Sequence, residues 1–170
     1  FRRQNREFLS EALPAHAAPL VARRARSALV SLERSWARRF ETLGASVSFS
    51  DGQAVALLAD GKPLGDGHLA QLRLLSELTT LNLSRTHITD AGLAHLSKLE
   101  KLESLELRYT SITSKGLAHL AKLPNLKRLN LQGTQVDNSG ASHLAQMTQL
   151  QLLSIEKTSI SDEGGAELKM

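Results

Sequence analysis

The chain has 170 residues, of which 41% are apolar, with one Trp, one Tyr, four Phe and a formal net charge of +4, so leucine must build most of its core. This length suits one ordinary domain and is too short for two sizeable ones. The lack of Cys excludes disulfides, zinc-binding cysteine clusters and thiol nucleophiles, and no stretch approaches the roughly 20 consecutive apolar residues of a membrane-spanning helix.

The first 43 residues carry the excess positive charge. They contain nine Arg and four Glu, whereas basic and acidic side chains are nearly balanced in residues 44–170. We therefore divide the chain into an Arg-rich helical segment, 1–43, and a main domain, 44–170. Because the sequence starts at Phe1 and not at Met, we expect that an upstream part was processed or trimmed. A short helix is expected near Asn5–Leu13, followed by a proline-containing linker.

A longer amphipathic helix is predicted from Leu20 to Leu43, with Gly44 as its stop signal. Apolar residues recur there every three or four positions, which places them in one stripe. The stripe consists of Val21, Ala25, Ala28, Leu29, Leu32, Trp36, Phe40 and Leu43. The arginines mostly lie away from it.

Three interpretations of this helix remain open. It can cap the end of the main domain, lie on a membrane surface, or dock into a groove of a partner protein. The last two would use Arg23, Arg24, Arg34, Trp36, Arg38 and Arg39. Nucleic acid is disfavoured as a partner, because the segment has basic charge without a recognised reading motif.

A β-hairpin is predicted next. Val47 and Phe49 alternate with polar residues, Asp51-Gly52 is a strong tight-turn pair, and Val55 and Leu57 resume the alternation. The second arm of this hairpin also begins a repeat.

The repeat is 24 residues long and is clearest in LTTLNLSRTHITDAGLAHLSKLEK, which starts at Leu78. Copies begin at Leu102, Leu126 and Leu150, and the same frame carried backwards gives a divergent first unit at the hairpin. A fixed period of this size predicts a solenoid of about five units, in which parallel strands stack side by side.

Each part of the unit has a structural explanation. The L-x-L pair alternates like a strand with one buried face. A Thr column (Thr86, Thr110, Thr134 and Thr158) is expected to hydrogen-bond its own or the neighbouring turn. Pairs such as Thr89-Asp90 provide helix N-caps. Gly92, Gly116, Gly140 and Gly164 suggest that the adjacent turn leaves little room for a side chain.

These residues resemble those of leucine-rich-repeat proteins, specifically a bacterial, planctomycete-like subtype with 24-residue repeats and the pattern T-x-I-T-D-x-G-L. The resemblance covers roughly residues 40–170. It implies a right-handed α/β solenoid with a concave parallel sheet and convex helices, preceded by a hairpin and an amphipathic cap helix. It also implies protein binding without catalysis, and it favours a membrane-associated or cell-envelope location.

The outward strand positions are the candidate binding surface, because the repeated core, turn and cap positions of the unit leave them free to vary. Arg and Tyr are residue types that anchor protein interfaces. Ser84 is expected to face outward with them. The candidate concave-face residues are Arg85, Glu106, Arg108, Tyr109, Arg128, Asn130 and Gln132.

Neither a catalytic site nor a cofactor or metal site is predicted. The recurring His95, His119 and His143 have no accompanying carboxylate column and are interpreted as copies of one solvated helix position. Two functions remain open: a protein-interaction or scaffold module, such as an accessory subunit, and the substrate-recognition part of an enzyme or effector with its catalytic domain elsewhere. The chain ends in mid-helix at Met170, so either further chain or another subunit is expected to cover that end.

Overall fold

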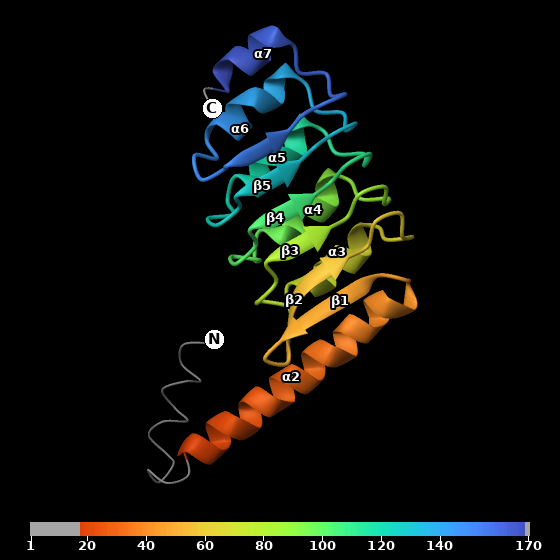
Figure 1. Cartoon of the computed structure of the whole chain (residues 1–170), viewed down its shortest axis with the longest axis vertical. Coiled ribbons are helices and arrows are strands. Elements are labelled where there is room, and N and C mark those ends of the chain that lie inside the picture. The colour runs from red at the N-terminus through yellow and green to blue at the C-terminus, as the bar shows by residue number, and fades with distance from the viewer. Residues whose placement is uncertain (1–17, 169–170) are drawn as a thin grey trace.

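The computed structural model describes residues 18–168, which form a stack of strand–helix units with one long helix at its end (Figure 1). The expected helix near Asn5–Leu13 lies outside the described residues. The strands are β1 (Ser46–Ser50), β2 (Gln53–Leu58), β3 (Thr80–Asn82), β4 (Ser104–Glu106), β5 (Arg128–Asn130) and β6 (Leu152–Ser154). The helices are α2 (Ala18–Thr42), α3 (Asp66–Leu72), α4 (Asp90–Leu96), α5 (Ser114–Leu120), the 3-10 helix η1 (Asn138–Gly140), α6 (Ala141–Ala145) and α7 (Asp162–Glu167).

The six strands form one sheet in sequence order. β1 and β2 pair antiparallel, which confirms the predicted hairpin, and β2 to β6 pair in parallel. Leu57 pairs with Leu81, and Leu81 pairs with Leu105, so neighbouring strands are in register at a shift of 24 residues. The sheet covers one side of the stack and α3 to α7 cover the other, as predicted for a solenoid.

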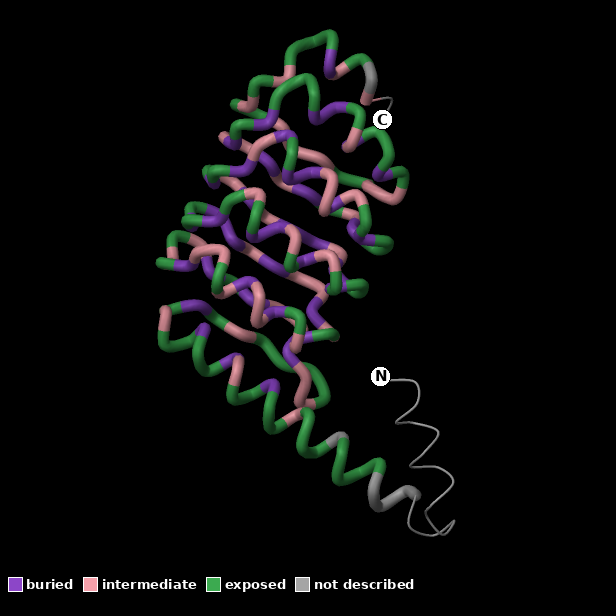
Figure 2. Tube along the Cα trace, turned by 180° about the vertical axis from the view of Figure 1, so that it is seen from behind, coloured by how far each residue is buried: buried purple, intermediate pink, exposed green. Residues whose placement is uncertain are grey.

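The core lies between the sheet and the helices. The strand leucines Leu81 and Leu105 and the helix leucines Leu93 and Leu117 are fully buried. Figure 2 shows that buried positions recur from unit to unit along the stack. Because each unit buries its apolar side chains against the next, stability comes mainly from contacts between neighbouring units.

The Thr column satisfies backbone groups at the turn after each strand. The hydroxyl of Thr110 donates to the carbonyl oxygen of Leu107 at 2.6 Å, and Thr134 makes the same bond to Leu131 at 2.7 Å. Both threonines are buried. Of the two predicted alternatives, the structure shows that these hydroxyls bond their own turn and not the neighbouring one.

A second polar column links the helix starts of adjacent units. Asp90 accepts hydrogen bonds from the backbone N–H and the hydroxyl of Thr113, at 2.9 and 2.6 Å. Thr113 in turn caps α5 by accepting from the backbone N–H of Lys115. One unit therefore orients the cap of the next. In the following unit, hydrogen bonds from Ser114 and Ser139 hold the pKa of Asp137 below its ordinary value.

The repeated glycine stands where this column passes closest to the next helix. A Cβ atom on Gly116 would lie 2.4 Å from Asp90 Oδ1 and 2.9 Å from Leu93 Cδ1. The prediction that there is little room for a side chain is confirmed. The neighbour that occupies the space is a carboxylate of the preceding unit.

Helix α2 closes the hairpin end of the stack and packs against β1 and β2. It ends as predicted: Gly44 has φ +84°, and the Ala45 N–H donates to the Phe40 carbonyl oxygen at 3.0 Å, the hydrogen bond that ends a helix in a Schellman motif. Only the C-terminal part of the predicted apolar stripe is buried. Phe40 is buried and Trp36 and Leu43 are half-buried, whereas Ala25, Ala28, Leu29 and Leu32 are exposed.

The face of α2 that packs against the hairpin is offset by one residue from the predicted stripe. Val30 is half-buried, and Glu33 and Ala37 are buried. Consecutive residues differ by about 100° around a helix, so the docked face and the exposed stripe point in different directions. Among residues 18–168, no helix combines the length and the apolar character required to cross a membrane.

The other end of the stack is less completely buried. Leu153, Ile155 and Ile160 are only partly buried, and Leu152 is 61% exposed. The inward helix position held by Leu93 and Leu117 is occupied by Ala141 in α6.

Candidate interaction surface on the sheet face

The outward side chains of the strands and of the turns that follow them form columns across the sheet, which we call the sheet face. In register, Thr80 lies beside Ser104, Ser104 beside Arg128, and Arg128 beside Leu152. A second column contains Leu58, Asn82, Glu106, Asn130 and Ser154. The strands therefore stack side by side at the 24-residue period, as predicted.

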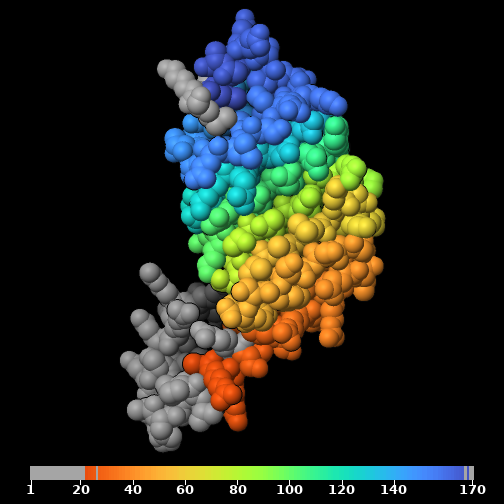
Figure 3. All heavy atoms as spheres, viewed as in Figure 1, coloured from red at the N-terminus to blue at the C-terminus, as the bar shows by residue number. Residues whose placement is uncertain are grey.

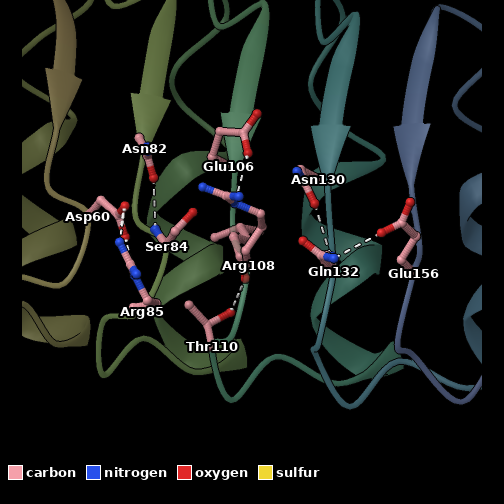
Figure 4. Close-up of polar contacts among 11 residues, drawn as sticks. Asp60, Asn82, Ser84, Arg85, Glu106, Arg108, Thr110, Asn130, Gln132 and Glu156 are labelled. Carbon is pink, nitrogen blue, oxygen red and sulfur yellow. Dashed lines mark hydrogen bonds and ion pairs between the residues drawn. The ribbon is translucent and has the colours of Figure 1, made fainter.

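Arg108 lies near the middle of this face and has an incomplete set of partners (Figure 4). Its Nε lies 3.6 Å from Glu106 Oε2, which is beyond hydrogen-bond distance, and this buried Nε has no hydrogen-bond partner among the described residues. Ser84 occupies the equivalent position in the previous unit. Contrary to the prediction that it faces solvent, Ser84 is 1% exposed and its hydroxyl has no partner among the described residues.

Arg85 is engaged with a carboxylate. Its Nε and Nη2 donate to the two carboxylate oxygens of Asp60 at 2.8 and 2.6 Å. This bidentate pair holds the pKa of Asp60 below its ordinary value and raises that of Arg85. Arg85 is thus committed to its neighbour and is a weaker candidate for partner binding than Arg108.

Arg128 has a weaker attachment. Its Nε donates to the hydroxyl of Ser104 at 3.3 Å, and the residue is exposed. Asn130 has a structural role, because its side-chain oxygen accepts from the backbone N–H of Gln132 at 3.0 Å. Gln132 in turn donates to Glu156 Oε2 at 2.9 Å. Of these residues, Arg128 is the one most available to a partner.

Tyr109 belongs to a turn instead of a strand. With Arg85, Gly133 and Lys157 it forms a column at left-handed φ values of 54–69°. Its ring lies over Gly133, where a Cβ atom would approach within 2.4 Å of Tyr109 Cδ1. The Tyr109 N–H still donates to the Gln132 carbonyl oxygen at 2.8 Å, so the backbone hydrogen bonding between neighbouring units continues through the turn. The side chain remains 47% exposed.

Two members of the sheet face were not predicted from the sequence. Leu58 is 43% exposed, and Asp60 is the partner of Arg85. The 24-residue frame does place Leu152 and Glu156 among the outward positions; Leu152 is 61% exposed, and Glu156 is the partner of Gln132. Carrying the 24-residue frame back by one unit puts Leu58 in the Asn82 column and Asp60 in the Ser84 column. The outward position of both residues could therefore have been predicted from the repeat.

The residues assigned to the N-terminal helix lie apart from the sheet face, at the end of the stack (Figure 3). Arg23, Arg24 and Arg38 are exposed. Arg34 lies over the ring of Phe49 at 5.9 Å, and Arg39 lies over the ring of Trp36 at 5.3 Å. Among residues 18–168, no three His, Asp or Glu side chains are grouped closely enough to hold a metal ion.

Comparisons with known proteins agree with this architecture. Residues 76–136 match the family model described as leucine rich repeat. No curated protein sequence matches the chain. Leiomodin-1 actin-binding site 2 superposes with a TM-score of 0.54 at 16% identity, over 67% of this chain and 76% of that one. This similarity supports the fold and does not extend to function.

Two other solved structures are similar at lower scores. An internalin from Listeria monocytogenes aligns with a TM-score of 0.39 and 21% identity over 50% of this chain. The ectodomain of the Arabidopsis thaliana receptor kinase GASSHO1/SCHENGEN3, solved with Casparian strip integrity factor 2, aligns with a TM-score of 0.44 and 14% identity over 67% of this chain. The alignments cover 30% and 17% of those two chains, respectively. With its 24-residue register, parallel sheet and family match at residues 76–136, the chain folds as a leucine-rich-repeat solenoid.

Proposed function

We propose that this chain is a non-enzymatic protein-interaction module that binds a partner protein, such as a subunit of a larger assembly, across β4 and β5 of the sheet face. Leucine-rich-repeat domains are generally protein-interaction modules. We also assign the chain to the 24-residue subtype with the pattern T-x-I-T-D-x-G-L. The pattern is strongest in the units that start at Leu78 and Leu102.

The observation that carries this proposal is the grouping of interface-type side chains with incomplete internal bonding. Arg108 and Arg128 come from adjacent strand–turn segments, and within residues 18–168 neither forms a close ion pair with a carboxylate. The exposed ring of Tyr109 and the exposed side chain of Leu152 flank them. Interface hot spots are enriched in Tyr and Arg, and apolar neighbours exclude water around them.

The partner segment is expected to carry acidic side chains. Arg85 is neutralised by Asp60 through a bidentate contact, so Arg108 and Arg128 provide the main available positive charge on the middle strands. A carboxylate of the partner would offer Arg108 the short bond that Glu106, at 3.6 Å, does not provide.

Affinity purification from the native source tests the proposal, with the intact chain as bait. The double substitution Arg108→Ala and Arg128→Ala is expected to reduce recovery of the specific partner by at least about tenfold, because removal of hot-spot residues costs about 2 kcal/mol or more. Lys115→Ala with Lys122→Ala makes the same change in net charge in and just after α5, where both lysines are exposed. This control is expected to bind like the wild type. Equal recovery with both double variants would exclude the sheet-face proposal.

A further inference from the structure

Helix α2 has an exposed apolar stripe that the solenoid does not use. Ala25, Ala28, Leu29 and Leu32 are exposed, with Leu29 at 60% and Leu32 at 49%, and Trp36 continues the stripe as a half-buried side chain. The spacing of four, three and four residues from Ala25 to Trp36 keeps the stripe on one side of the helix. In Figure 1 the N-terminal half of α2 extends beyond the hairpin, so this part of the helix is free of the sheet.

The docked and exposed faces of α2 can be occupied at the same time. The docked residues Val30, Glu33 and Ala37 each follow one residue after Leu29, Leu32 and Trp36, respectively. This offset separates the two faces by about 100° around the helix axis. The capping contact with the hairpin therefore leaves the stripe accessible.

The charge on α2 identifies the chemistry of a partner for the stripe. The helix contains six Arg and two Glu, and Glu33 is buried against the hairpin. Exposed arginines occur towards both ends of the stripe, at Arg23 and Arg24 and at Arg38 and Arg39. Arg39 also lies over the ring of Trp36. A helix with bulky apolar residues on one side and arginines beside and opposite them matches an anionic lipid surface, where Trp occupies the headgroup level.

We propose that α2 binds the surface of an anionic membrane, with Leu29, Leu32 and Trp36 inserted at the headgroup boundary and the flanking arginines paired with lipid phosphates. The helix lies in the plane of the surface. The adjacent face of the helix holds the solenoid through Val30, Glu33 and Ala37. This site is separate from the sheet-face site proposed above.

The test uses the intact 170-residue chain and vesicles of phosphatidylcholine with about 30% phosphatidylserine, compared with vesicles of phosphatidylcholine alone. The chain is expected to float with the anionic vesicles, and less so as added salt screens the arginines. Trp36 is the only Trp in the chain, so its fluorescence reports directly on the stripe. We expect a blue shift of its emission and quenching by brominated lipid.

Matched variants separate the stripe from other exposed leucines. Leu29→Ser with Leu32→Ser is expected to lower vesicle binding by roughly tenfold or more. Leu58→Ser with Leu152→Ser removes two exposed leucines from the sheet face and is expected to leave vesicle binding unchanged. Arg38→Gln with Arg39→Gln is expected to weaken binding and to reduce its dependence on salt. Circular dichroism of each variant checks that the fold is retained.

Several outcomes would overturn the membrane proposal. These are no flotation of the intact chain, equal binding by the two leucine double variants, dimerisation through the stripe in light scattering, and binding that appears only after residues 1–17 are removed. The Arg108→Ala and Arg128→Ala variant is expected to bind vesicles normally. Failure of one proposal is therefore distinguishable from failure of the other.

Discussion

At the scale of single residues, one methyl group at the start of a repeat helix decides whether two units can stack. A Cβ atom on Gly116 would overlap Asp90 Oδ1, which already accepts a hydrogen bond from the Thr113 backbone N–H. The carboxylate cannot move away without losing that bond. The glycine is needed for space and not for backbone freedom, since Gly116 does not adopt a positive φ.

We predict that Gly116→Ala destabilises the chain by about 1–3 kcal/mol, the usual cost of overpacking. Gly67 in α3 is the matched control, because the position that its Cβ atom would take has no neighbour within 4 Å in the described part of the chain, and Ala91 occupies the equivalent site in α4. Gly67→Ala is expected to stabilise by about 0.5–1 kcal/mol, since Ala is the better helix former. Urea unfolding measures both. A neutral or stabilising Gly116→Ala would contradict the predicted overlap.

The sequence was sufficient to predict residues whose role repeats in the units from Leu78 onward. The Thr column and the crowded glycines follow from the period alone. The left-handed turn column was not predicted, because Arg85, Tyr109 and Lys157 show no sign of it and only Gly133 is a residue that favours positive φ. Ser84 was placed on the surface by its column, yet it is buried in the structure. The position of a residue in the repeat determines the side of the sheet on which its side chain lies. Its solvent exposure depends on how far the neighbouring side chains cover it.

At the scale of elements, α2 shows how apolar periodicity can point away from the docked face. The periodicity predicted a stripe that ends in Trp36, Phe40 and Leu43. The C-terminal part of the stripe does pack inward at Phe40, but the docked surface also extends over the adjacent face, which includes the buried carboxyl group of Glu33. The backbone N–H of Ala54 donates to Glu33 at 3.3 Å, so a polar contact helps to fix the docking angle. A search for apolar periodicity cannot detect a docking face centred on a glutamate.

The buried Glu33 gives this docking a pH dependence. Burial raises the pKa of Glu33 above the ordinary 4.5, with a smaller contribution from the charge of Glu77, against the lowering effect of hydrogen bonds from Ala54 and Gln53. The folded state therefore binds a proton more readily than the unfolded chain. The stability linked to this proton is fully present below pH 4.5 and is lost as the pH rises through the raised pKa.

We predict that Glu33→Gln raises Tm by a few degrees at about pH 7 and leaves it nearly unchanged at about pH 4. Glutamine keeps an oxygen that can accept from the Ala54 N–H and removes the cost of burying a charge. Thermal unfolding by circular dichroism at the two pH values measures the difference. Glu41→Gln, at an exposed position of the same helix, is the control. A variant that loses stability at neutral pH would show that the charged form of Glu33 is the stabilising one.

At the scale of the whole molecule, the solenoid and its number of units were predictable because one frame accounts for every parallel strand, β2 to β6. The surface proposed to bind a partner was less predictable. Its exposed leucines, Leu58 and Leu152, lie in columns that contain polar residues in the middle units. The ion pair between Arg85 and Asp60 joins two units and is visible only when their turns are placed side by side. The proposed binding surface therefore depends on combinations of residues from several units.

The same unit-by-unit construction predicts a gradient of local stability along this 170-residue chain. A middle unit is held by two neighbours, and its leucines are fully buried, as Leu105 is. The unit of β6 has Leu152 exposed and Leu153, Ile155 and Ile160 only partly buried, so opening it exposes less apolar surface. In a solenoid such an opening leaves the remaining units folded.

Hydrogen exchange under native conditions measures this gradient. The amides of Leu83 and Leu107, which donate to Glu106 and Asn130 at 2.9 Å, are expected to exchange slowest. The amide of Leu152, bonded to the Lys127 carbonyl oxygen at 3.0 Å, is expected to exchange at least about tenfold faster despite its similar hydrogen bond, because its unit opens without global unfolding. Ile160→Ala should speed exchange at Leu152 and leave Leu83 nearly unchanged. Equal acceleration at both amides would instead show that the solenoid unfolds as one cooperative unit.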